Sequence, residues 1–366
     1  MTEKDFMPLY NDVSIPLKGS VAYRSPSNIA LVKYWGKREP QLPSNPSLSF
    51  TLQHCATTTQ VHFDKRTSFE EKYALDLFFE GKPKEAFKPK IVSFFERIEL
   101  YMPFIRDLHF VVETSNSFPH SSGIASSASG MSALALCLMD IERLFVPNMD
   151  SLYFNRKASF LARLGSGSAS RSVEGELVVW GKHDLVAQSS DLYGVKYPGK
   201  VHPVFANYQD TILLVDKGEK QVSSTVGHQL MHGHPFATQR FDQAGNNLTR
   251  LTTVLAEGDL KGFIELVESE ALSLHAMMMT SLPYFMLMKP NTLKILEKIW
   301  QFRQGTGLPV CFTLDAGANV HVLYPEKDKQ KVFEFIKNEL VAYCQNGQYI
   351  CDRTGKGAER LFDQKV

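Results

Sequence analysis

The sequence predicts an α+β or α/β protein, because segments with strand periodicity alternate with segments of helical periodicity along the whole chain. Thr57–Phe63 and Leu108–Thr114 alternate in polarity and are rich in β-branched residues, which is typical of strands. A run of Ser, Asn, Pro and Gly follows over 115–130, and apolar residues then recur at helical spacing from Met131 to Phe145. A strand, a small-residue loop and a helix therefore follow one another directly.

The rest of the chain continues this alternation. Further helices are expected at Tyr153–Leu164, at Phe236–Ala276 with breaks at Gly245, Gly258 and Gly262, at Thr292–Arg303 and at Lys327–Tyr343. Further strands are expected at Leu177–Trp180, Thr211–Val215, Val310–Leu314 and Val320–Tyr324. With 366 residues, the chain can form one large domain or two ordinary ones. A boundary is expected near Pro198–Asn207, and about 18 N-terminal residues are expected to form a loosely structured extension.

Composition and charge narrow the class of protein. Hydrophobic residues make up 43% and charged residues 22%, which is typical of a globular chain and not of a disordered one. The formal net charge of +1 gives no general electrostatic case for binding nucleic acid. The five cysteines form no CxxC pair and no zinc spacing, and no apolar run of membrane-spanning length occurs. These features predict a soluble cytoplasmic protein without a membrane or nucleic-acid partner.

The stretch Pro119–Gly130, with the sequence PHSSGIASSASG, is the most informative loop in the chain. Its small side chains let the backbone approach a ligand closely, and it leads into a helix N-terminus, which favours anions. Its serine hydroxyls could bind phosphate oxygens or a hydrated magnesium ion. The chain has no GxxxxGK[ST] motif. Taken alone, the stretch fits a phosphate-binding loop and a serine-rich helix cap equally well.

Three distant segments each supply charged groups. Ser27–Lys37 (SNIALVKYWGK) contains Lys33 and Lys37, which are either surface lysines or cations that face a phosphate or carboxylate. Gly165–Ser172 (GSGSASRS) contains Arg171, whose guanidinium could bind a carboxylate or phosphate through two hydrogen bonds.

The third charged segment, Thr313–Asn319 (TLDAGAN), places Asp315 after an apolar strand. Its carboxylate could stabilise an Asx-turn, or it could act as a base or orienting group. A further hydroxyl-rich stretch, Lys220–Gly227 (KQVSSTVG), begins with a lysine.

Together and in this order, these segments resemble the diphosphomevalonate decarboxylases, a family of the GHMP small-molecule kinase superfamily. The resemblance extends from about Ser25 to Lys327 and includes LPSNPSLSFTL at Leu42–Leu52. It implies a two-lobed α+β fold of the GHMP-kinase type, with the active site in the cleft between the lobes. It also implies an extension (1–18), a ribosomal protein S5 domain 2-like N-terminal domain that binds the ATP phosphates (19–205), and an α/β-sandwich C-terminal domain (206–366).

The resemblance further implies a reaction. The family phosphorylates the C3 hydroxyl of (R)-5-diphosphomevalonate with MgATP, and loss of that phosphate and of CO2 then gives isopentenyl diphosphate in the mevalonate pathway of isoprenoid biosynthesis. Asp315 corresponds to the catalytic aspartate at the C3 hydroxyl, Lys33 to the lysine beside it, and Arg171 to the arginine that binds the substrate carboxylate.

By the same resemblance, other residues match binding positions. The implied substrate-binding residues, besides Arg171, are Asn28, Tyr34, Lys37, Ser166, Ser168, Ser223 and Ser224. The implied ATP-binding residues are Ser121, Ser122, Gly123, Ala125, Ser126, Ser127 and Ser129. Ser126 or Ser127 is expected near Mg²⁺, and a homodimer is implied.

The chain departs from the family pattern at single positions. The family usually has a proline where this chain has Ala318, a methionine at His228, and a threonine at His120. Two other functions remain open: a kinase of mevalonate-type substrates that does not decarboxylate, and an inactive nucleotide-binding homologue. The presence of Lys33, Asp315 and Arg171 together favours the decarboxylase.

Overall fold

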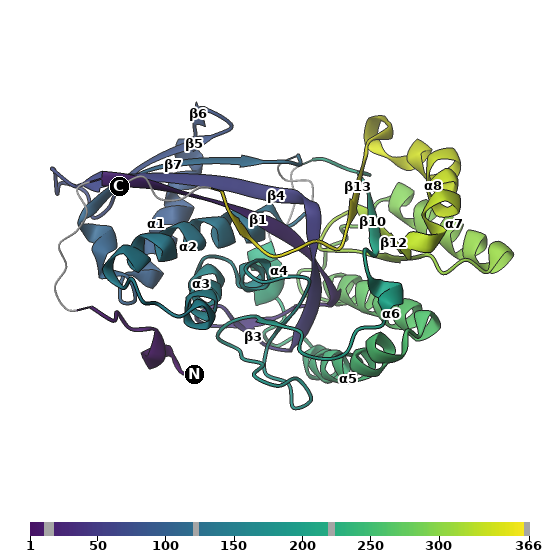
Figure 1. Cartoon of the computed structure of the whole chain (residues 1–366). Helices are drawn as coiled ribbons and strands as arrows, with labels where there is room; N and C mark the ends of the chain where they lie inside the picture. Colours follow the sequence, from purple (N-terminus) through teal and green to yellow (C-terminus); the bar gives the residue numbers. More distant parts are fainter. Residues whose placement is uncertain (11–17, 120–123, 219–223, 362–366) are drawn as a thin grey trace.

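The computed structural model describes residues 1–10, 18–119, 124–218 and 224–361, and it confirms the predicted α+β class (Figure 1). Two sheets, of eight and four strands, form the frame, and helices cover them. A short two-stranded hairpin, β2 (Lys37–Arg38) and β3 (Leu42–Pro43), stands apart from both sheets. No helix that the structure describes is long and apolar enough to cross a membrane.

The eight-stranded sheet has the order β14-β1-β4-β7-β5-β6, and β8 and β9 extend it beside the start of β4. Neighbouring strands pair antiparallel, except for the parallel pair β5 and β7. The bounds are β1 Lys18–Val32, β4 Ser47–Lys65, β5 Ala74–Phe79, β6 Lys82–Pro83, β7 Leu108–Asn116, β8 Leu177–Trp180, β9 Val195–Lys196 and β14 Glu359–Arg360.

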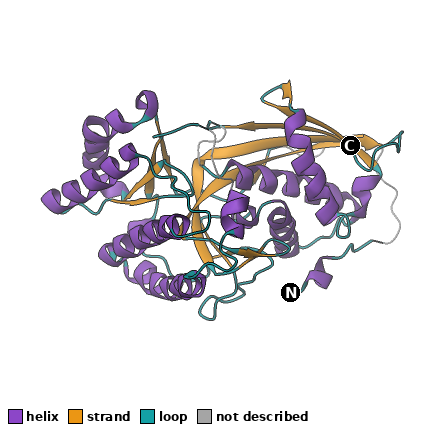
Figure 2. Ribbon diagram, turned by 180° about the vertical axis from the view of Figure 1, so that it is seen from behind, coloured by secondary structure: helices purple, strands orange, loops and turns teal. Residues whose placement is uncertain are grey.

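Three helices cover one face of this sheet: α1 (Lys88–Ile98), α2 (Ser126–Phe145) and α3 (Ser151–Gly165). Figures 1 and 2 show them packed together on that face. α2 contacts β1, β4 and α3 at once, so every residue from Met131 to Glu142 is buried. The start of α2, where the predicted phosphate loop ends, is thereby held firmly against the sheet.

The four-stranded sheet is antiparallel, with the order β11-β12-β10-β13. Its strands are β10 Gln209–Leu213, β11 Cys311–Thr313, β12 Val320–Tyr324 and β13 Tyr349–Arg353. The helices of this part of the chain are α4 Ser224–Gln229, α5 Ala237–Glu257, α6 Leu260–Met279, α7 Pro290–Thr306 and α8 Lys329–Phe335. α6 contacts β11 of this sheet and β1 of the larger one, so it lies where the two sheets meet.

The C-terminal segment also ties the two sheets together. After β13 the chain runs back to the larger sheet, where β14 pairs with β1 (yellow in Figure 1). Asp352 on β13 accepts hydrogen bonds from the backbone N–H groups of His54 (2.9 Å) and Cys55 (2.7 Å) on β4. The last strand thus belongs to the sheet built mainly from the N-terminal half, and the expected domain limits at 19–205 and 206–366 stay a prediction.

Most predicted elements are confirmed, and the differences are local. The strands at Leu177–Trp180 and Val320–Tyr324 have the expected bounds. The helical stretch 236–276 breaks only at Gly258, whose φ is +76°, so the expected breaks at Gly245 and Gly262 are wrong. Packing stabilises both helices enough to accept a glycine within them.

Two other boundaries also differ from expectation. α2 begins at Ser126, so the last five residues of the predicted loop are helical. The last expected helix continues past α8 as a π-helical turn over Ile336–Leu340 and a 3-10 turn over Val341–Tyr343.

The N-terminal segment is not loosely structured where it is described. Residues Glu3–Phe6 form a 3-10 turn, and Phe6 is 0% exposed. Its ring stacks on Phe160 of α3 with centroids 4.5 Å apart and meets Tyr193 edge-on at 5.9 Å. The expectation of a loose extension is therefore wrong for Phe6, because one aromatic side chain anchors the segment to the core.

We expect Phe6→Ala to lower the free energy of unfolding by about 3–5 kcal/mol, since it removes a fully buried ring. Urea unfolding followed by circular dichroism measures the change. Leu9→Ala, at a side chain that is 58% exposed, is the matched control and should stay within about 0.5 kcal/mol of the parent. Equal stabilities for both variants would show that the N-terminal segment does not contribute to the core.

Candidate active site

Lys33 and Asp315 meet at the junction of the two sheets. Lys33 directly follows β1, and Asp315 lies two residues after the end of β11. Lys33 Nζ donates a hydrogen bond to Asp315 Oδ1 at 3.1 Å. Lys33 is 1% exposed, and burial lowers its pKa, while the carboxylates of Asp315 and Glu270 act in the opposite direction. The structure thus excludes the reading of Lys33 as a surface lysine.

The turn that carries Asp315 is anchored at its C-terminal end. The carbonyl of Ala318 accepts a hydrogen bond from the Thr292 hydroxyl at 2.7 Å, and Thr292 belongs to α7. The side-chain oxygen of Asn319 accepts from the backbone N–H of Asp216 at 3.0 Å. These contacts hold the Asp315 turn in place although Ala318 occupies the position of the expected proline.

Arg171 is held by hydroxyl groups on the neighbouring strand. It lies in the 3-10 turn Gly167–Ser172 and is 3% exposed. Nη1 donates to Ser47 Oγ at 2.8 Å, and Nε donates to Ser49 Oγ at 3.0 Å and to Asn28 Oδ1 at 3.3 Å. Both serines are on β4 and have no exposed surface. Such partners orient a guanidinium without neutralising it.

The charge of Arg171 persists in this buried place. Burial lowers its pKa to about 10, and the carboxylate of Asp315 partly offsets the effect, so the group stays protonated at neutral pH. Its guanidinium also lies 5.9 Å from the ring centre of Tyr34 and 5.7 Å from that of Trp180. No hydrogen bond from Nη2 is found among the described residues, so this part of the fork can bind a ligand carboxylate.

Asn28 connects this arginine to the serine turn. Its side-chain amide donates to the Ser168 carbonyl at 3.1 Å and to the Ser172 hydroxyl at 2.8 Å. Ser166 and Ser168 are half-buried. The structure thereby brings Asn28, Ser168 and Arg171 together.

Tyr34 and Trp35 pack against a buried histidine from α4. The ring of His228 lies 4.3 Å from that of Tyr34 and 4.6 Å from that of Trp35, centre to centre. Its Nδ1 accepts the backbone N–H of Gly36 at 3.0 Å, and burial lowers its pKa to about 3, so the ring is neutral. Lys37 is only 6% exposed, which excludes a surface role for it too. His228 thus packs on the backbone between the two lysines.

The beginning of α2 has the geometry of an anion site. Ala125, the residue before the helix, has φ +48°, a left-handed conformation that is uncommon for a residue with a side chain. Ser126 and Ser127 follow as the first helical residues, and their N–H groups have no partner within a helix. Ser129 differs: it is 0% exposed, and its hydroxyl lies 2.6 Å from that of Thr57. This geometry argues against Ser129 as a phosphate ligand, because its hydroxyl serves the packing of α2 on β4.

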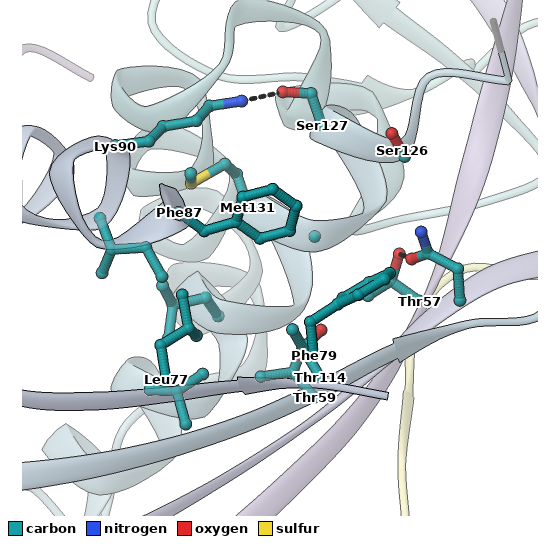
Figure 3. Close-up of a pocket in the computed structure, with 15 residues that line it drawn as sticks. Thr57, Thr59, Leu77, Phe79, Phe87, Lys90, Thr114, Ser126, Ser127 and Met131 are labelled. Atoms are coloured by element: carbon teal, nitrogen blue, oxygen red, sulfur yellow. Dashed lines mark hydrogen bonds between the residues drawn. The ribbon is translucent and has the colours of Figure 1, made fainter. Parts of the chain in front are cut away.

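A cavity of about 200 Å³ opens beside Ser126 and Ser127, between the sheet and helices α1 and α2 (Figure 3). Its floor is apolar, and the rings of Phe79 and Phe87 meet in it with centroids 5.5 Å apart. The ammonium of Lys90 on α1 donates a hydrogen bond to the Ser127 hydroxyl. The cavity lining consists of Thr57, Thr59, Leu77, Phe79, Phe87, Lys90, Ile91, Val112, Thr114, Asn116, Ser126, Ser127, Gly130, Met131 and Leu134.

The cavity suits a planar, largely apolar ring whose charged tail reaches the start of α2. Apolar lining with few polar groups is typical of small-molecule sites. Lys90, Ser126 and Ser127 at one end can bind anionic oxygens. The same end of α2 is tied to the Arg171 region, because the Ser27 hydroxyl donates to the carbonyl of Ile124.

The described residues contain no group of three or more His, Cys, Asp or Glu side chains that could hold a metal ion. A magnesium ion at this site would therefore depend on phosphate oxygens, water and a hydroxyl. Ser126 and Ser127 supply such hydroxyls, and Mg²⁺ commonly binds in this way with few protein ligands. The donor set fits a nucleotide-bound magnesium ion.

Some predicted positions lie outside the described residues. These are His120, Ser121, Ser122, Gly123 and Ser223, and the side chain of Ser224 is likewise outside them.

Sequence reasoning missed Ser47, Ser49 and Lys90. The serines did leave a signal, since Ser47, Ser49 and Thr51 alternate with large apolar residues along one strand and all three are buried. Hydroxyls on an inward strand face need partners, which points to a buried polar group beside them. The sequence around Lys90 gives no such indication, because a lysine at this spacing is common on the exposed face of an amphipathic helix.

Comparison with known proteins gives the same family for both parts of the chain. The model of the diphosphomevalonate decarboxylase-like N-terminal domain matches residues 25–191, and that of the mevalonate 5-diphosphate decarboxylase C-terminal domain matches 211–362. The chain is 29% identical to diphosphomevalonate decarboxylase mvd1 of Aspergillus fumigatus over 86% of its length and 78% of the relative. It is 28% identical to the diphosphomevalonate decarboxylase of Saccharomyces cerevisiae over 85% of its length and 79% of the relative.

Solved structures agree. The mevalonate diphosphate decarboxylase of Staphylococcus aureus has a TM-score of 0.80 at 27% identity, covering 94% of this chain and 98% of that one. A complex described as MDDEF with MVAPP, AMPPCP and magnesium has a TM-score of 0.80 at 28% identity, covering 94% and 99%. These similarities also confirm the GHMP-kinase type of fold. With both domain models matched in order over most of its length, the chain belongs to the diphosphomevalonate decarboxylase family.

Proposed function

We propose that the chain converts (R)-5-diphosphomevalonate and ATP, with Mg²⁺, into isopentenyl diphosphate, CO2, ADP and phosphate in the mevalonate pathway. The observation that carries the proposal is the pairing of Lys33 with Asp315 at 3.1 Å, within electrostatic reach of the buried Arg171. An enzyme that phosphorylates and decarboxylates a hydroxy acid needs a carboxylate that accepts a hydrogen bond from the substrate hydroxyl. It also needs a cation that binds the substrate carboxylate. A relative in complex with MVAPP, AMPPCP and magnesium supports the same set of ligands.

Asp315 acts first in the proposed reaction. Its carboxylate, held in place by Lys33, accepts a hydrogen bond from the C3 hydroxyl and aims the hydroxyl oxygen at the γ-phosphorus of ATP. As the new O–P bond forms and the bond to ADP breaks, the hydroxyl proton passes to the carboxylate. Positioning of two reactants in this way supplies a large part of the rate enhancement in phosphoryl transfer.

Arg171 acts in the second step. Its guanidinium holds the substrate carboxylate next to C3 while the C3–O bond breaks and phosphate leaves with the electron pair. The pair of the bond to the carboxylate then moves to form the C=C bond, and CO2 departs. A fixed carboxylate matters here, because only a bond aligned with the electron-poor centre can break productively.

The remaining residues bind the two phosphate-bearing ligands. The adenine ring fits the cavity of Figure 3, and Lys90, Ser126 and Ser127 bind the ATP phosphates. A bound Mg²⁺ at Ser126 or Ser127 supplies charge neutralisation of the phosphate oxygens. Around the substrate's diphosphate and carbon chain lie Asn28, Tyr34, Lys37, Ser166 and Ser168, and the hydroxyls of Ser223 and Ser224 face the transferred phosphate.

We propose as well that the protein acts in the cytoplasm as a homodimer. The family resemblance supports the dimer. All five cysteines are free thiols, four of them buried, which suits a reducing compartment.

The reaction is tested by incubating the protein with diphosphomevalonate, mevalonate or phosphomevalonate in the presence of MgATP. We expect equal amounts of ADP and CO2 with diphosphomevalonate, measured by a coupled ADP assay and by trapping of labelled CO2. ADP without CO2 would identify a kinase that does not decarboxylate. Nucleotide binding without turnover on any of the three would identify an inactive homologue.

We expect Asp315→Ala to lower kcat at least ~10³-fold, because both orientation of the hydroxyl and transfer of its proton are lost. Steady-state kinetics measures the effect, and circular dichroism establishes that the variant is folded. A kcat near that of the parent in a folded variant would remove Asp315 from the mechanism.

We expect Arg171→Lys to lower kcat/KM for diphosphomevalonate by about 10²-fold or more, since an ammonium cannot reproduce the fork between Ser47, Ser49 and the substrate. Arg66→Lys is the matched control. Arg66 is also buried, at 6% exposure, and donates only to backbone carbonyls near the far end of β4. The control should keep its kcat/KM even where the substitution lowers its stability. Unchanged kinetics in Arg171→Lys would refute the role in carboxylate binding.

A further inference from the structure

The backbone of Lys33 is held on both sides by buried side chains. Its N–H donates to Glu270 Oε2 at 2.8 Å, and its carbonyl accepts from the Asn45 amide at 2.9 Å. Glu270 is 0% and Asn45 is 3% exposed, so water does not compete for these contacts. The base of the Lys33 side chain is therefore fixed independently of Asp315.

The backbone of Asp315 is held in a similar way. Its carbonyl lies 3.1 Å from Nε2 of His275, and a carbonyl only accepts, so the proton of this ring sits on Nε2. His275 is 1% exposed, and burial lowers its pKa to about 4, while the hydrogen bond to Asp315 acts in the opposite direction. At neutral pH the ring is a neutral donor with one defined tautomer.

Glu270 and His275 belong to the same helix, α6. This helix contacts both β1 and β11, the strands that lead to Lys33 and Asp315. Figure 1 shows α6 beside α5, below the four-stranded sheet. A single rigid element thus binds the backbone of both partners of the ion pair, which come from different sheets.

Glu270 is itself fixed by α5. Its two carboxylate oxygens accept from both terminal nitrogens of Arg240, from the Asn247 amide at 2.6 Å and from Lys33 N–H. Arg240 is 3% exposed, so the pair is buried. Such a fork between guanidinium and carboxylate allows little movement of either group.

We propose that α6 sets the separation of Lys33 and Asp315, and that Glu270 and His275 are positioning residues for the reaction. The inference rests on the proposed function for its kinetic consequence and on geometry alone for its structural one. Neither residue needs to touch the substrate. A displacement of about 1 Å in a reacting group can lower the rate about 10²-fold. Small shifts of Lys33 or Asp315 relative to α6 should therefore lower kcat measurably.

Two variants test the proposal. In the parent, the two oxygens of Glu270 accept from Arg240, Asn247 and the Lys33 N–H. Glu270→Gln leaves only one accepting oxygen for these donors. His275→Phe removes the N–H that donates to the Asp315 carbonyl but keeps an aromatic ring. His275→Gln is the conservative rescue, because its amide N–H can reach the Asp315 carbonyl. Glu268→Gln is the matched control: Glu268 is a buried carboxylate on the same helix, but its partners are Trp300 and Arg303 of α7.

Crystal structures and steady-state kinetics of the four variants are compared with the parent. We expect the distance from Lys33 Nζ to Asp315 to exceed about 4 Å, the limit of an ion pair, in Glu270→Gln and His275→Phe. We expect kcat to fall about 10- to 100-fold in both, with KM for both substrates within about threefold. His275→Gln should recover most of the rate, and Glu268→Gln should keep both distance and kcat.

An unchanged Lys33–Asp315 distance and an unchanged kcat in Glu270→Gln and His275→Phe would overturn the proposal. An equal loss of kcat in Glu268→Gln would also overturn it, because it would show that any loss of helix stability lowers kcat. If the parent protein releases no CO2 from diphosphomevalonate, the proposed function fails, and the Lys33–Asp315 distance in the variants still decides the role of α6.

Discussion

The contact between Lys33 and Asp315 is the constraint on which the rest of the structure depends. Burying an ammonium group costs several kcal/mol unless a partner and hydrogen bonds compensate it. Here the partner comes from the other sheet, so the charge is stabilised only when both sheets and the turn after β11 are in place. The same ammonium orients the partly exposed carboxylate of Asp315 through a hydrogen bond to Oδ1. The Lys33–Asp315 pair therefore forms only when the two sheets are packed against each other.

The long strand β4 connects the Arg171 region to the cavity beside α1 and α2. Near its start, Ser47 and Ser49 hold Arg171, and further along Thr57 and Thr59 line the cavity between α1 and α2. One strand therefore sets the distance between the group proposed to bind the substrate carboxylate and the cavity proposed for adenine. This arrangement accounts for the buried hydroxyl-bearing residues Ser47, Ser49, Thr57 and Thr59 of β4.

The sequence allowed prediction of the fold class and the main periodic elements, because these have local signals. The three charged residues were selected by the resemblance of several segments to one family, since each segment alone left a structural role open. Asp315 follows an apolar strand, and Arg171 lies in a serine-rich turn. Glu270 and His275 could not be found this way, since both sit in an ordinary helical stretch and their partners are 237 and 40 residues distant. The burial of Phe6 and the inward hydroxyl of Ser129 were missed for the same reason: tertiary packing decides them, and no local pattern records it.

The most direct test of the proposed chemistry follows the C3 oxygen itself. Diphosphomevalonate labelled with oxygen-18 in its C3 hydroxyl is converted with unlabelled MgATP, and the inorganic phosphate and water are analysed by mass spectrometry. If Asp315 directs that oxygen to the γ-phosphorus and the phosphate then leaves from C3, the label appears in inorganic phosphate in equal amount to the CO2 released. Label in water, with unlabelled phosphate, would contradict phosphorylation of the C3 hydroxyl.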